Sequence, residues 1–352
     1  MKALLLASFF LSSILGFTQE TAVLVKPDVE PHPEGKPTDP ETGLRVQIFL
    51  DQEHFGPGFL DGKPGNFTSR AVYAYNRSKG RNPADWPAVI AEAEAAVPDI
   101  YATATVPSIA AKFVDRSLPS SYEAQARRKD LPYRSYLEFM AERYHTSETF
   151  LEELNGTKKA WSIGPRDTLI VPNIKPFLIE ALTRGKMHKE DPILSARTVV
   201  LDTKGRQVFI YDPAEEEVLV KSGPVIVTED GTDQETYGKL IAVFPITPGQ
   251  DKFIHHGEWK IANCVEFPEW RYDKQLLKTG KRSKTALQIP PGPNNPVGVV
   301  WTGLTKSGIG IHGTSSPRTI GRAQSAGCFR LSNWDAARIP TLVRPGARAI
   351  VR

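Results

Sequence analysis

The sequence predicts a mainly β carboxy-terminal domain, a sandwich or barrel, preceded by two small modules, one α-helical and one α+β. Three observations predict this architecture. From residue 196 onward, short β-forming runs alternate with turns rich in Gly, Pro and Asp. Residues 44–80 carry apolar side chains at helical spacing, and residues 133–173 combine that spacing with a final β-forming run. A chain of 352 residues is long enough for two or three domains, each with its own core.

The amino terminus has the features of an export signal. Lys2 precedes an apolar run over residues 3–17, which is too short to span a bilayer comfortably and fits the apolar region of a signal peptide. We therefore expect a signal peptide over residues 1–18, an exported protein in the periplasm or cell wall, and no integral membrane segment after signal removal. No clean Ala-x-Ala site is present, so an uncleaved anchor is the alternative. The proline-rich residues 19–43 predict a linker without regular structure.

Residues 44–105 predict a small helical module. Val46, Phe49 and Leu50 lie at helical spacing, a Gly-rich turn follows over residues 58–62, and residues 68–75 predict a capped helix. This order of helix, turn and helix resembles the small helical peptidoglycan-binding module. The alternative is an ordinary helical hairpin that packs on the rest of the chain.

Residues 130–176 predict an α+β module. Apolar side chains mark a helix over residues 136–144, a Ser/Thr cap begins a second helix over residues 146–155, and residues 169–173 predict a strand. The order resembles a LysM domain, a family that binds glycans containing N-acetylglucosamine, although the usual opening strand of that domain is not evident. A degenerate copy that only packs is the alternative.

The third region, residues 196–352, predicts an all-β domain with one late helix. The expected strands are Thr198–Leu201, Val208–Tyr211, Val225–Val227, Lys239–Phe244, Trp259–Ile261 and the closing Ala347–Val351. The helix is expected to be capped by Asn333 and interrupted by Pro340. Cys264 falls in an apparent strand and predicts a small packed residue.

Two short motifs in this region pair a possible base with a possible nucleophile. The first runs from Ile311 through His312 and Gly313 to Thr314, and the second is Ser-Ala-Gly-Cys-Phe-Arg over residues 325–330. A thiol reacts mainly as its thiolate, and a nearby imidazole that takes the proton brings its pKa toward neutrality. Glycines let backbone amides approach a reacting carbonyl. For an arbitrary Cys and His, burial in the core is the commoner role, so the motif context decides.

These motifs resemble the signature of the L,D-transpeptidase catalytic domain, the YkuD-like family. The resemblance extends before them to residues 290–296 and 301–304, and after them to residues 331–336. It implies an enzyme that acts on peptidoglycan stem peptides through a thioester on Cys328, with His312 as general base and acid. The product would be a 3-3 cross-link or an acceptor attached to the wall. Water as acceptor would make the enzyme an L,D-carboxypeptidase.

The resemblance also implies roles for the neighbouring residues. The carbonyl of Gly313 would orient His312, and the backbone amides around Ala326 and Gly327 would form an oxyanion hole. Ala326 stands where family members often carry a histidine, so a wall-binding protein with an inactive catalytic domain is a further alternative. The substrate would be bound by Arg330, Ser325, Thr314 and Trp301.

Composition limits the other function classes. The net charge of +4 comes from 44 basic and 40 acidic residues without a dense basic run, which argues against nucleic acid as a partner. The expected partner is peptidoglycan, through its stem peptides and, in a further hypothesis, its glycan strands. His255 and His256 would point to opposite faces of a strand, so no metal site is expected, and no cofactor is implied. A disulfide between Cys264 and Cys328 would block the nucleophile and is not expected.

Overall fold

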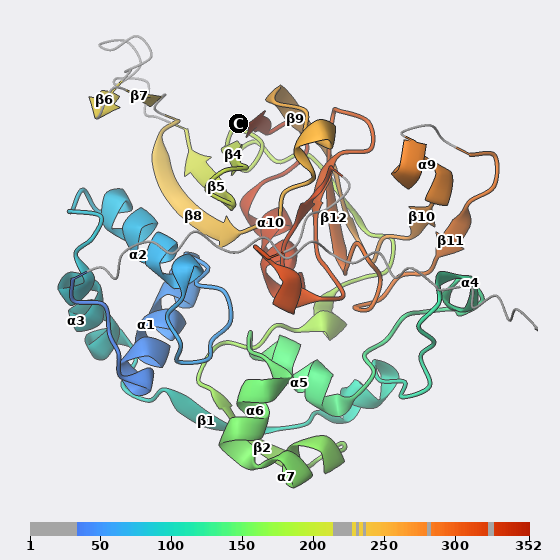
Figure 1. The fold of residues 1–352 in the computed structure, drawn as a ribbon, viewed down its shortest axis with the longest axis horizontal. Coiled ribbons are helices and arrows are strands. Elements are labelled where there is room, and N and C mark those ends of the chain that lie inside the picture. Colours follow the sequence, from blue (N-terminus) through green and yellow to red (C-terminus); the bar gives the residue numbers. More distant parts are fainter. Residues whose placement is uncertain (1–33, 214–226, 230–231, 235–236, 280–282, 323–326) are drawn as a thin grey trace, which may run out of the picture.

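The computed structural model describes residues 34–213, 227–229, 232–234, 237–279, 283–322 and 327–352. Figure 1 shows a large sheet domain with the helices of the amino-terminal half gathered along one side of it. The expected signal peptide, most of the expected linker, Val225, Ser325 and Ala326 lie outside the described residues. Within the described ranges, no helix is both long and apolar enough to cross a membrane.

Three helices form the first part of the described chain: α1 (Pro40–Gln52), α2 (Asn66–Ser78) and α3 (Trp86–Ala96). The two helices predicted over residues 44–50 and 68–75 are therefore confirmed. The predicted linker, however, ends earlier than expected, because α1 begins at Pro40 rather than after residue 43. The Asp39 side chain accepts a hydrogen bond from the Thr42 backbone N–H, and proline is well suited to a first helical turn.

A second group of elements follows: β1 (Tyr101–Thr105), α4 (Tyr122–Gln125), α5 (Tyr136–Arg143), α6 (Glu148–Asn155), α7 (Thr157–Ser162) and β2 (Thr168–Pro172). β1 pairs antiparallel with β2, with Tyr101 opposite Pro172. Residues 101–105 were expected to end the helical module, but this pairing joins them to the second group. The strand gives little sequence signal because Ala104 is its one buried residue. The LysM resemblance stays a prediction.

The mainly β nature of the carboxy-terminal region is confirmed, and its principal sheet is a single curled sheet of nine strands. Their order is β14-β13-β12-β9-β15-β4-β5-β8, with β3 also paired to β9. The strands are β3 (Met187–His188), β4 (Thr198–Asp202), β5 (Gln207–Asp212), β8 (Lys239–Pro245), β9 (Gly257–Glu266), β12 (Val300–Leu304), β13 (Gly310–His312), β14 (Phe329–Arg330) and β15 (Arg348–Val351). Smaller elements are β6 (Val227–Glu229), β7 (Thr232–Gln234), β10 (Trp270–Tyr272), α9 (Lys274–Thr279) and β11 (Leu287–Ile289).

One helix, α10 (Asn333–Leu342), packs its apolar residues into the same core as the sheet. The helix was expected to be capped by Asn333, but the cap is Ser332, whose hydroxyl accepts a hydrogen bond from the Asp335 N–H. The side chain of Asn333 is used elsewhere, as described below. Pro340 was expected to interrupt the helix, yet the helix continues to Leu342.

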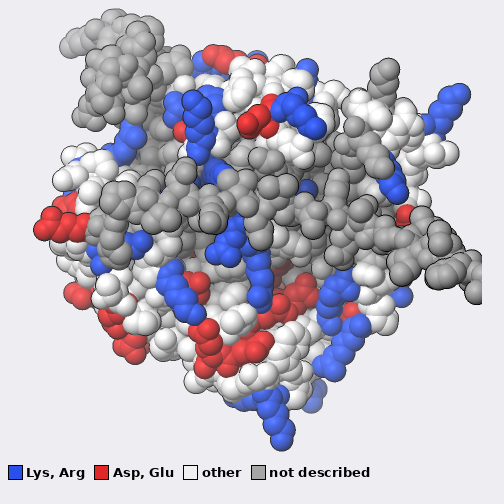
Figure 2. Space-filling model, viewed as in Figure 1, with Lys and Arg blue, Asp and Glu red and all other residues white. Residues whose placement is uncertain are grey.

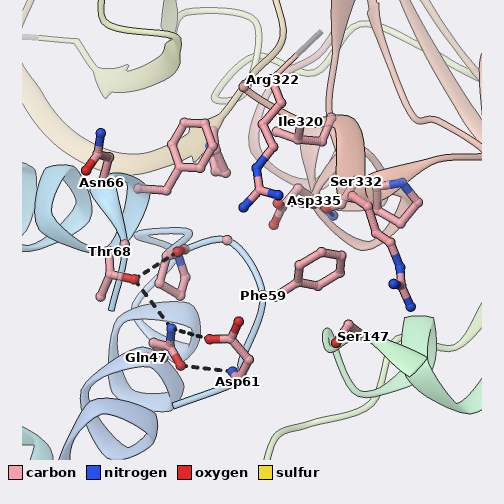
Figure 3. Close-up of a pocket in the computed structure, with 18 of the residues that line it drawn as sticks. Gln47, Phe59, Asp61, Asn66, Thr68, Ser147, Ile320, Arg322, Ser332 and Asp335 are labelled. Atoms are coloured by element: carbon pink, nitrogen blue, oxygen red, sulfur yellow. Dashed lines mark hydrogen bonds between the residues drawn. The ribbon is translucent and has the colours of Figure 1, made fainter. Parts of the chain in front are cut away.

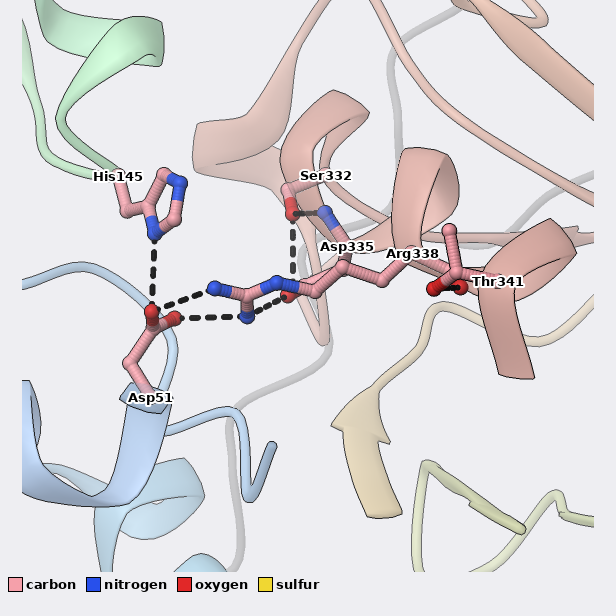
Figure 4. A network of polar contacts seen from close by, with 6 residues as sticks. All are labelled: Asp51, His145, Ser332, Asp335, Arg338 and Thr341. Atoms are coloured by element: carbon pink, nitrogen blue, oxygen red, sulfur yellow. Dashed lines mark hydrogen bonds and ion pairs between the residues drawn. The ribbon is translucent and has the colours of Figure 1, made fainter. Parts of the chain in front are cut away.

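An ion-pair network joins the helical part to the sheet domain (Figure 4). The Arg338 guanidinium on α10 contacts both oxygens of the Asp51 carboxylate on α1, at 2.6 and 3.0 Å. His145, at the end of α5, approaches the same carboxylate with its Nδ1 atom at 3.0 Å. Burial opposes the charge on Asp51, but the neighbouring Arg338 and His145 hold the pKa of that carboxyl well below its usual range. The two parts of the chain therefore share a charged interface as well as an apolar one.

Candidate active site

The two sequence motifs meet at one edge of the sheet. β13 and β14 are parallel, with Ile311 opposite Phe329 and His312 opposite Arg330. The Leu331 N–H donates to the His312 carbonyl at 2.7 Å, which continues the pairing. Because His312 and Arg330 are directly opposite each other, their side chains share one face of the sheet, and Cys328 lies in the bend immediately before β14. The parallel strand pair thus brings together two motifs whose His312 and Cys328 lie sixteen positions apart in the sequence.

His312 is buried and its tautomer is fixed by the backbone. Its Nδ1 atom lies 2.6 Å from the carbonyl oxygen of Gly313. A carbonyl can only accept, so Nδ1 carries the proton and Nε2 is left as the acceptor in the neutral ring. Burial and then the charge of Arg330 lower the pKa of His312 to about 3, against a smaller opposing effect of the Gly313 carbonyl. The imidazole is therefore neutral at physiological pH, with its proton on Nδ1.

Cys328 is held as a neutral thiol. Its Sγ donates to the Gly308 carbonyl at 3.4 Å. Burial raises the pKa of the thiol to about 11, although a backbone hydrogen bond from Gly310 and the charge of Arg330 act in the opposite direction. The sequence predicted a thiol pKa brought toward neutrality, and in the resting structure it is raised instead because desolvation outweighs the nearby charge. No disulfide joins Cys328 to Cys264, which is fully buried in β9.

Arg330 acts on both groups through its charge, since it lowers the pKa of His312 and of Cys328. It therefore favours the thiolate and the neutral imidazole together. We expect Arg330→Gln to raise the pKa of the Cys328 thiol. Alkylation by iodoacetamide at neutral pH should then slow by about tenfold, the lower end of what one neighbouring charge does to a thiol. A pH profile of alkylation that stays in place would contradict this electrostatic role.

Trp301 on β12 is opposite His312 in the β12–β13 pairing, and their rings stack with centroids 5.5 Å apart and planes 15° apart. Two glycines make room for the indole. A Cβ on Gly310 would lie 2.6 Å from the Trp301 ring, and one on Gly303 would lie 2.8 Å from its Nε1 atom. Trp301 was predicted to bind substrate, and in the structure its ring packs against the imidazole.

The other predicted residues of the site occupy turns. Thr314 is buried and its hydroxyl accepts a hydrogen bond from the Ser316 N–H at 3.2 Å. Gly327 has a φ of +110°, a conformation that favours glycine, and Gly249 packs directly on its backbone. Ser325 and Ala326 lie outside the described residues, so the expected oxyanion hole is described only at Gly327 and Cys328.

Residues 196–351 match the family model described as the L,D-transpeptidase catalytic domain, YkuD. This part of the chain belongs to the YkuD family. A putative L,D-transpeptidase YkuD of Bacillus licheniformis is 36% identical over 78 residues, which are 22% of this chain and 47% of that protein. A protein of the same name from Bacillus subtilis is 41% identical over 59 residues, 17% of this chain and 36% of the relative. The chain thus spans about half the length, or less, of these curated relatives.

Solved structures of L,D-transpeptidases are also similar at low identity. L,D-transpeptidase 3 from Mycobacterium tuberculosis, in complex with a faropenem-derived adduct, is 14% identical with a TM-score of 0.30. That alignment covers 54% of this chain and 76% of the other. An L,D-transpeptidase from Mycobacterium smegmatis is 13% identical with a TM-score of 0.30, over 59% of this chain and 86% of that one.

A buried asparagine supports the turn that follows His312 in the YkuD domain. Asn333 Oδ1 accepts a hydrogen bond from the Val299 N–H at 3.1 Å, and it occupies the space that a side chain on Gly313 would need. Its Nδ2 donates to Glu142 Oε1 at 2.8 Å, and the Tyr133 hydroxyl donates to the other oxygen of Glu142 at 2.5 Å. Sequence reasoning missed this contact because Glu142 lies 191 residues away, in the second module.

Glu142 offers a test of this support. We expect Glu142→Ala to leave the Tyr133 hydroxyl without this acceptor and Asn333 Nδ2 with the Pro293 carbonyl at 3.3 Å, and to lower the free energy of unfolding by about 1–3 kcal/mol. Glu142→Gln keeps an acceptor for Asn333. Burial raises the pKa of Glu142 from 4.5 to about 8, so the folded protein holds this proton more tightly than the unfolded chain. The contribution of this proton to the free energy of unfolding is fully present below pH 4.5 and is lost as the pH rises from 4.5 through 8. Chemical denaturation of Glu142→Gln should show a weaker pH dependence over that interval, and an unchanged profile would contradict the assignment.

Within the described ranges, no group of three or more His, Cys, Asp or Glu side chains is arranged to hold a metal ion. His255 and His256 are both exposed ahead of β9.

Proposed function

We propose that the protein is a cysteine-dependent L,D-transpeptidase that acts on peptidoglycan stem peptides. The observation that carries this proposal is the bond between His312 Nδ1 and the Gly313 carbonyl, at 2.6 Å. It leaves Nε2 as a proton acceptor at the edge where β13 pairs with β14, the strand that Cys328 immediately precedes. Membership of residues 196–351 in the YkuD family supports the same reaction class.

In the first half-reaction, Cys328 Sγ attacks the carbonyl carbon between the third stem residue, an L-centre, and the terminal D-residue. With the thiol pKa near 11 and the imidazole pKa near 3, a resting ion pair is unfavourable. The proton therefore moves to His312 as the C–S bond forms. Backbone amides around Gly327 stabilise the oxyanion. The C–N bond then breaks, the imidazolium returns the proton to the leaving amine, and a thioester remains.

In the second half-reaction, an amine of another stem peptide attacks the thioester carbonyl. His312 takes the proton of the amine and returns it to the departing sulfur, so the enzyme regains its starting state. The product is a 3-3 cross-link, or a different acceptor attached to the wall. Because the chain spans about half the length, or less, of the curated relatives described above, the substrate and partners are part of the proposal. We extend it to an exported protein whose first two modules contact the wall, including its glycan strands.

The test is mass spectrometry of muropeptides after the protein is incubated with purified wall material. New 3-3 dimers support transpeptidation, and shortened monomers alone indicate an L,D-carboxypeptidase in the same site. Labelling of the protein by a β-lactam, measured as intact mass, reports the acylation step separately. If neither new products nor a covalent label appears, the proposal is refuted, and a wall-binding protein with an inactive catalytic domain takes its place.

Ala326 distinguishes a working enzyme from a degenerate one. If the loop contributes through its backbone amides, Ala326→His restores no obligatory proton transfer, and we expect less than about a tenfold change in acylation rate. The measurement is single-turnover β-lactam acylation of both proteins. An increase of several orders of magnitude over an almost inactive parent would show that the natural chain has lost catalytic function.

A further inference from the structure

A cavity of 580 Å³ lies where the three parts of the chain meet (Figure 3). Its walls are the loop between α1 and α2, the start of α6, the turn between β4 and β5, residues 317–322 and the start of α10. This volume is within the range of small-ligand pockets. The cavity is separate from the His312 and Cys328 side chains, neither of which lines it.

Basic side chains dominate the charge of this cavity. They are Lys63, Arg70, Lys204, Arg206, Arg318 and Arg322, against the two carboxylates of Asp61 and Asp335. Figure 3 shows Arg322 pointing into the cavity, and Figure 2 shows basic side chains near the middle of this face, between the helices and the sheet.

Some of this charge is already balanced within the protein. Lys63 pairs with Glu153 at 3.0 Å, and Arg318 pairs with Glu148 at 3.2 Å. In the described part of the chain, by contrast, Lys204 and Arg322 contact no carboxylate, and both side chains are exposed. Asp335 is itself paired with Arg338, and burial raises its pKa to about 7. An anionic ligand would supply the missing negative charge.

Apolar rings share the lining with these charges. Phe59, Phe67 and Trp334 contribute aromatic faces, and three prolines line the cavity beside them. Phe67 reaches across to the catalytic domain, because a Cβ on Gly321 would lie 2.2 Å from its ring. A single inorganic anion would leave most of this lining uncovered. A larger ligand that carries both carboxylates and small apolar groups would contact it throughout.

The wall formed by residues 317–322 leads directly to the segment of Cys328. The Gly321 N–H donates to the Thr247 hydroxyl at 2.7 Å, and Arg206 donates to the Gly321 carbonyl. Thr247 in turn exchanges two backbone hydrogen bonds with Arg330, at 2.9 and 3.0 Å. A ligand held by Arg322 would therefore contact residues 317–322. Thr247, which binds this segment at Gly321, is also hydrogen-bonded to Arg330 on β14, the strand that follows Cys328.

We propose that this cavity binds an acidic peptide, at a second site distinct from the one in which the thiol reacts. Stem peptides of the wall polymer carry such carboxylates beside small apolar side chains, so the choice of ligand rests on the proposed function. In the cross-linked polymer, a peptide bound here would belong to the wall segment that lies beside the reacting stem.

The experiment is isothermal titration calorimetry of the full chain at low salt with N-acetyl-Glu-Ala-Glu-amide. This peptide has no D-residue to transfer, and N-acetyl-Gln-Ala-Gln-amide is its uncharged match. We expect the Gln peptide to bind at least about tenfold more weakly, and the double variant Lys204→Gln/Arg322→Gln to weaken binding of the Glu peptide by at least the same factor. The matched control, Lys112→Gln/Lys189→Gln, removes two exposed charges outside the cavity and should bind like the natural chain.

Absence of binding, equal binding of the two peptides, or full retention of binding by the Lys204/Arg322 variant would each overturn the proposal. If inorganic phosphate displaces the peptide at a comparable concentration, the cavity is a simple anion site and the peptide proposal is refuted. Acylation by a β-lactam, measured on the same variants, reports the thiol independently. Peptide binding without acylation would refute the proposed function and leave the proposed peptide site supported. Acylation without peptide binding would support the proposed function and refute the peptide site.

Discussion

We expect Cys328→Ala to abolish thioester formation and all cross-linking while the fold stays intact. Cys328 is the sulfur that the proposed mechanism acylates. The side chain is half-buried and the exchange removes one atom, so the free energy of unfolding should change by less than about 1 kcal/mol. Intact-mass spectrometry after β-lactam treatment, together with chemical denaturation, measures both effects.

Cys264→Ala is the matched control for this variant. Cys264 is fully buried in β9, opposite Thr302, and burial raises the pKa of its thiol to about 11. We expect its replacement to cost about 1 kcal/mol of stability through lost packing and to leave acylation unchanged. A covalent adduct on Cys264, or continued cross-linking by Cys328→Ala, would refute the assignment of the nucleophile.

The second large effect is expected for His312→Ala, which should slow acylation at least about a hundredfold, the low end of general-base contributions. The pH dependence of the natural enzyme gives a sharper criterion. Because the pKa of His312 is lowered from 6.5 to about 3, the imidazole is already neutral at pH 5. The rate of single-turnover acylation by the natural enzyme should therefore show no transition near pH 6.5 that is due to His312. The factor by which His312→Ala slows acylation should then be similar at pH 5 and pH 8.

His256→Ala is the control for this experiment, since His256 is exposed and lies outside the site. It should retain the natural rate at both pH values. An acylation rate of His312→Ala within a few-fold of the natural rate would show that another group takes the proton. A pronounced ionisation near pH 6.5 in the natural enzyme alone would show that His312 titrates as an exposed histidine.

The fold could be predicted from sequence where periodicity was strong. Residues 198–201, 208–211 and 239–244 alternate or form apolar runs, and each lies within an observed strand, β4, β5 and β8. The strands that hold the site were less visible. β14 has two residues and β13 has three, too few for a period, and their parallel pairing depends on contacts that no local pattern encodes. The early start of α1 could not be predicted because its first residue, Pro40, ends a proline-rich stretch that is typical of a linker, although proline also suits a first helical turn.

The sequence predicted which residues belong to the candidate site, but not the pKa of the Cys328 thiol or the contacts that support the site. The motifs around His312 and Cys328 predicted that these two residues act together, and the sheet edge brings their strands into register. The raised pKa of the thiol could not be predicted, because it depends on the tertiary packing around Cys328. The Glu142 contact to Asn333 was equally hidden, since it joins modules that the sequence suggested were separate.

The contact between Asp51 and Arg338 also determines how the molecule can be dissected. These residues lie 287 positions apart, and the Asp51 carboxylate is fully buried. A chain that starts at residue 196 would lose the Asp51 carboxylate and would expose to water the face of α10 that carries Arg338. We therefore expect the helices and the YkuD domain to unfold as one cooperative unit, with the amino-terminal half as a folding partner of the carboxy-terminal half.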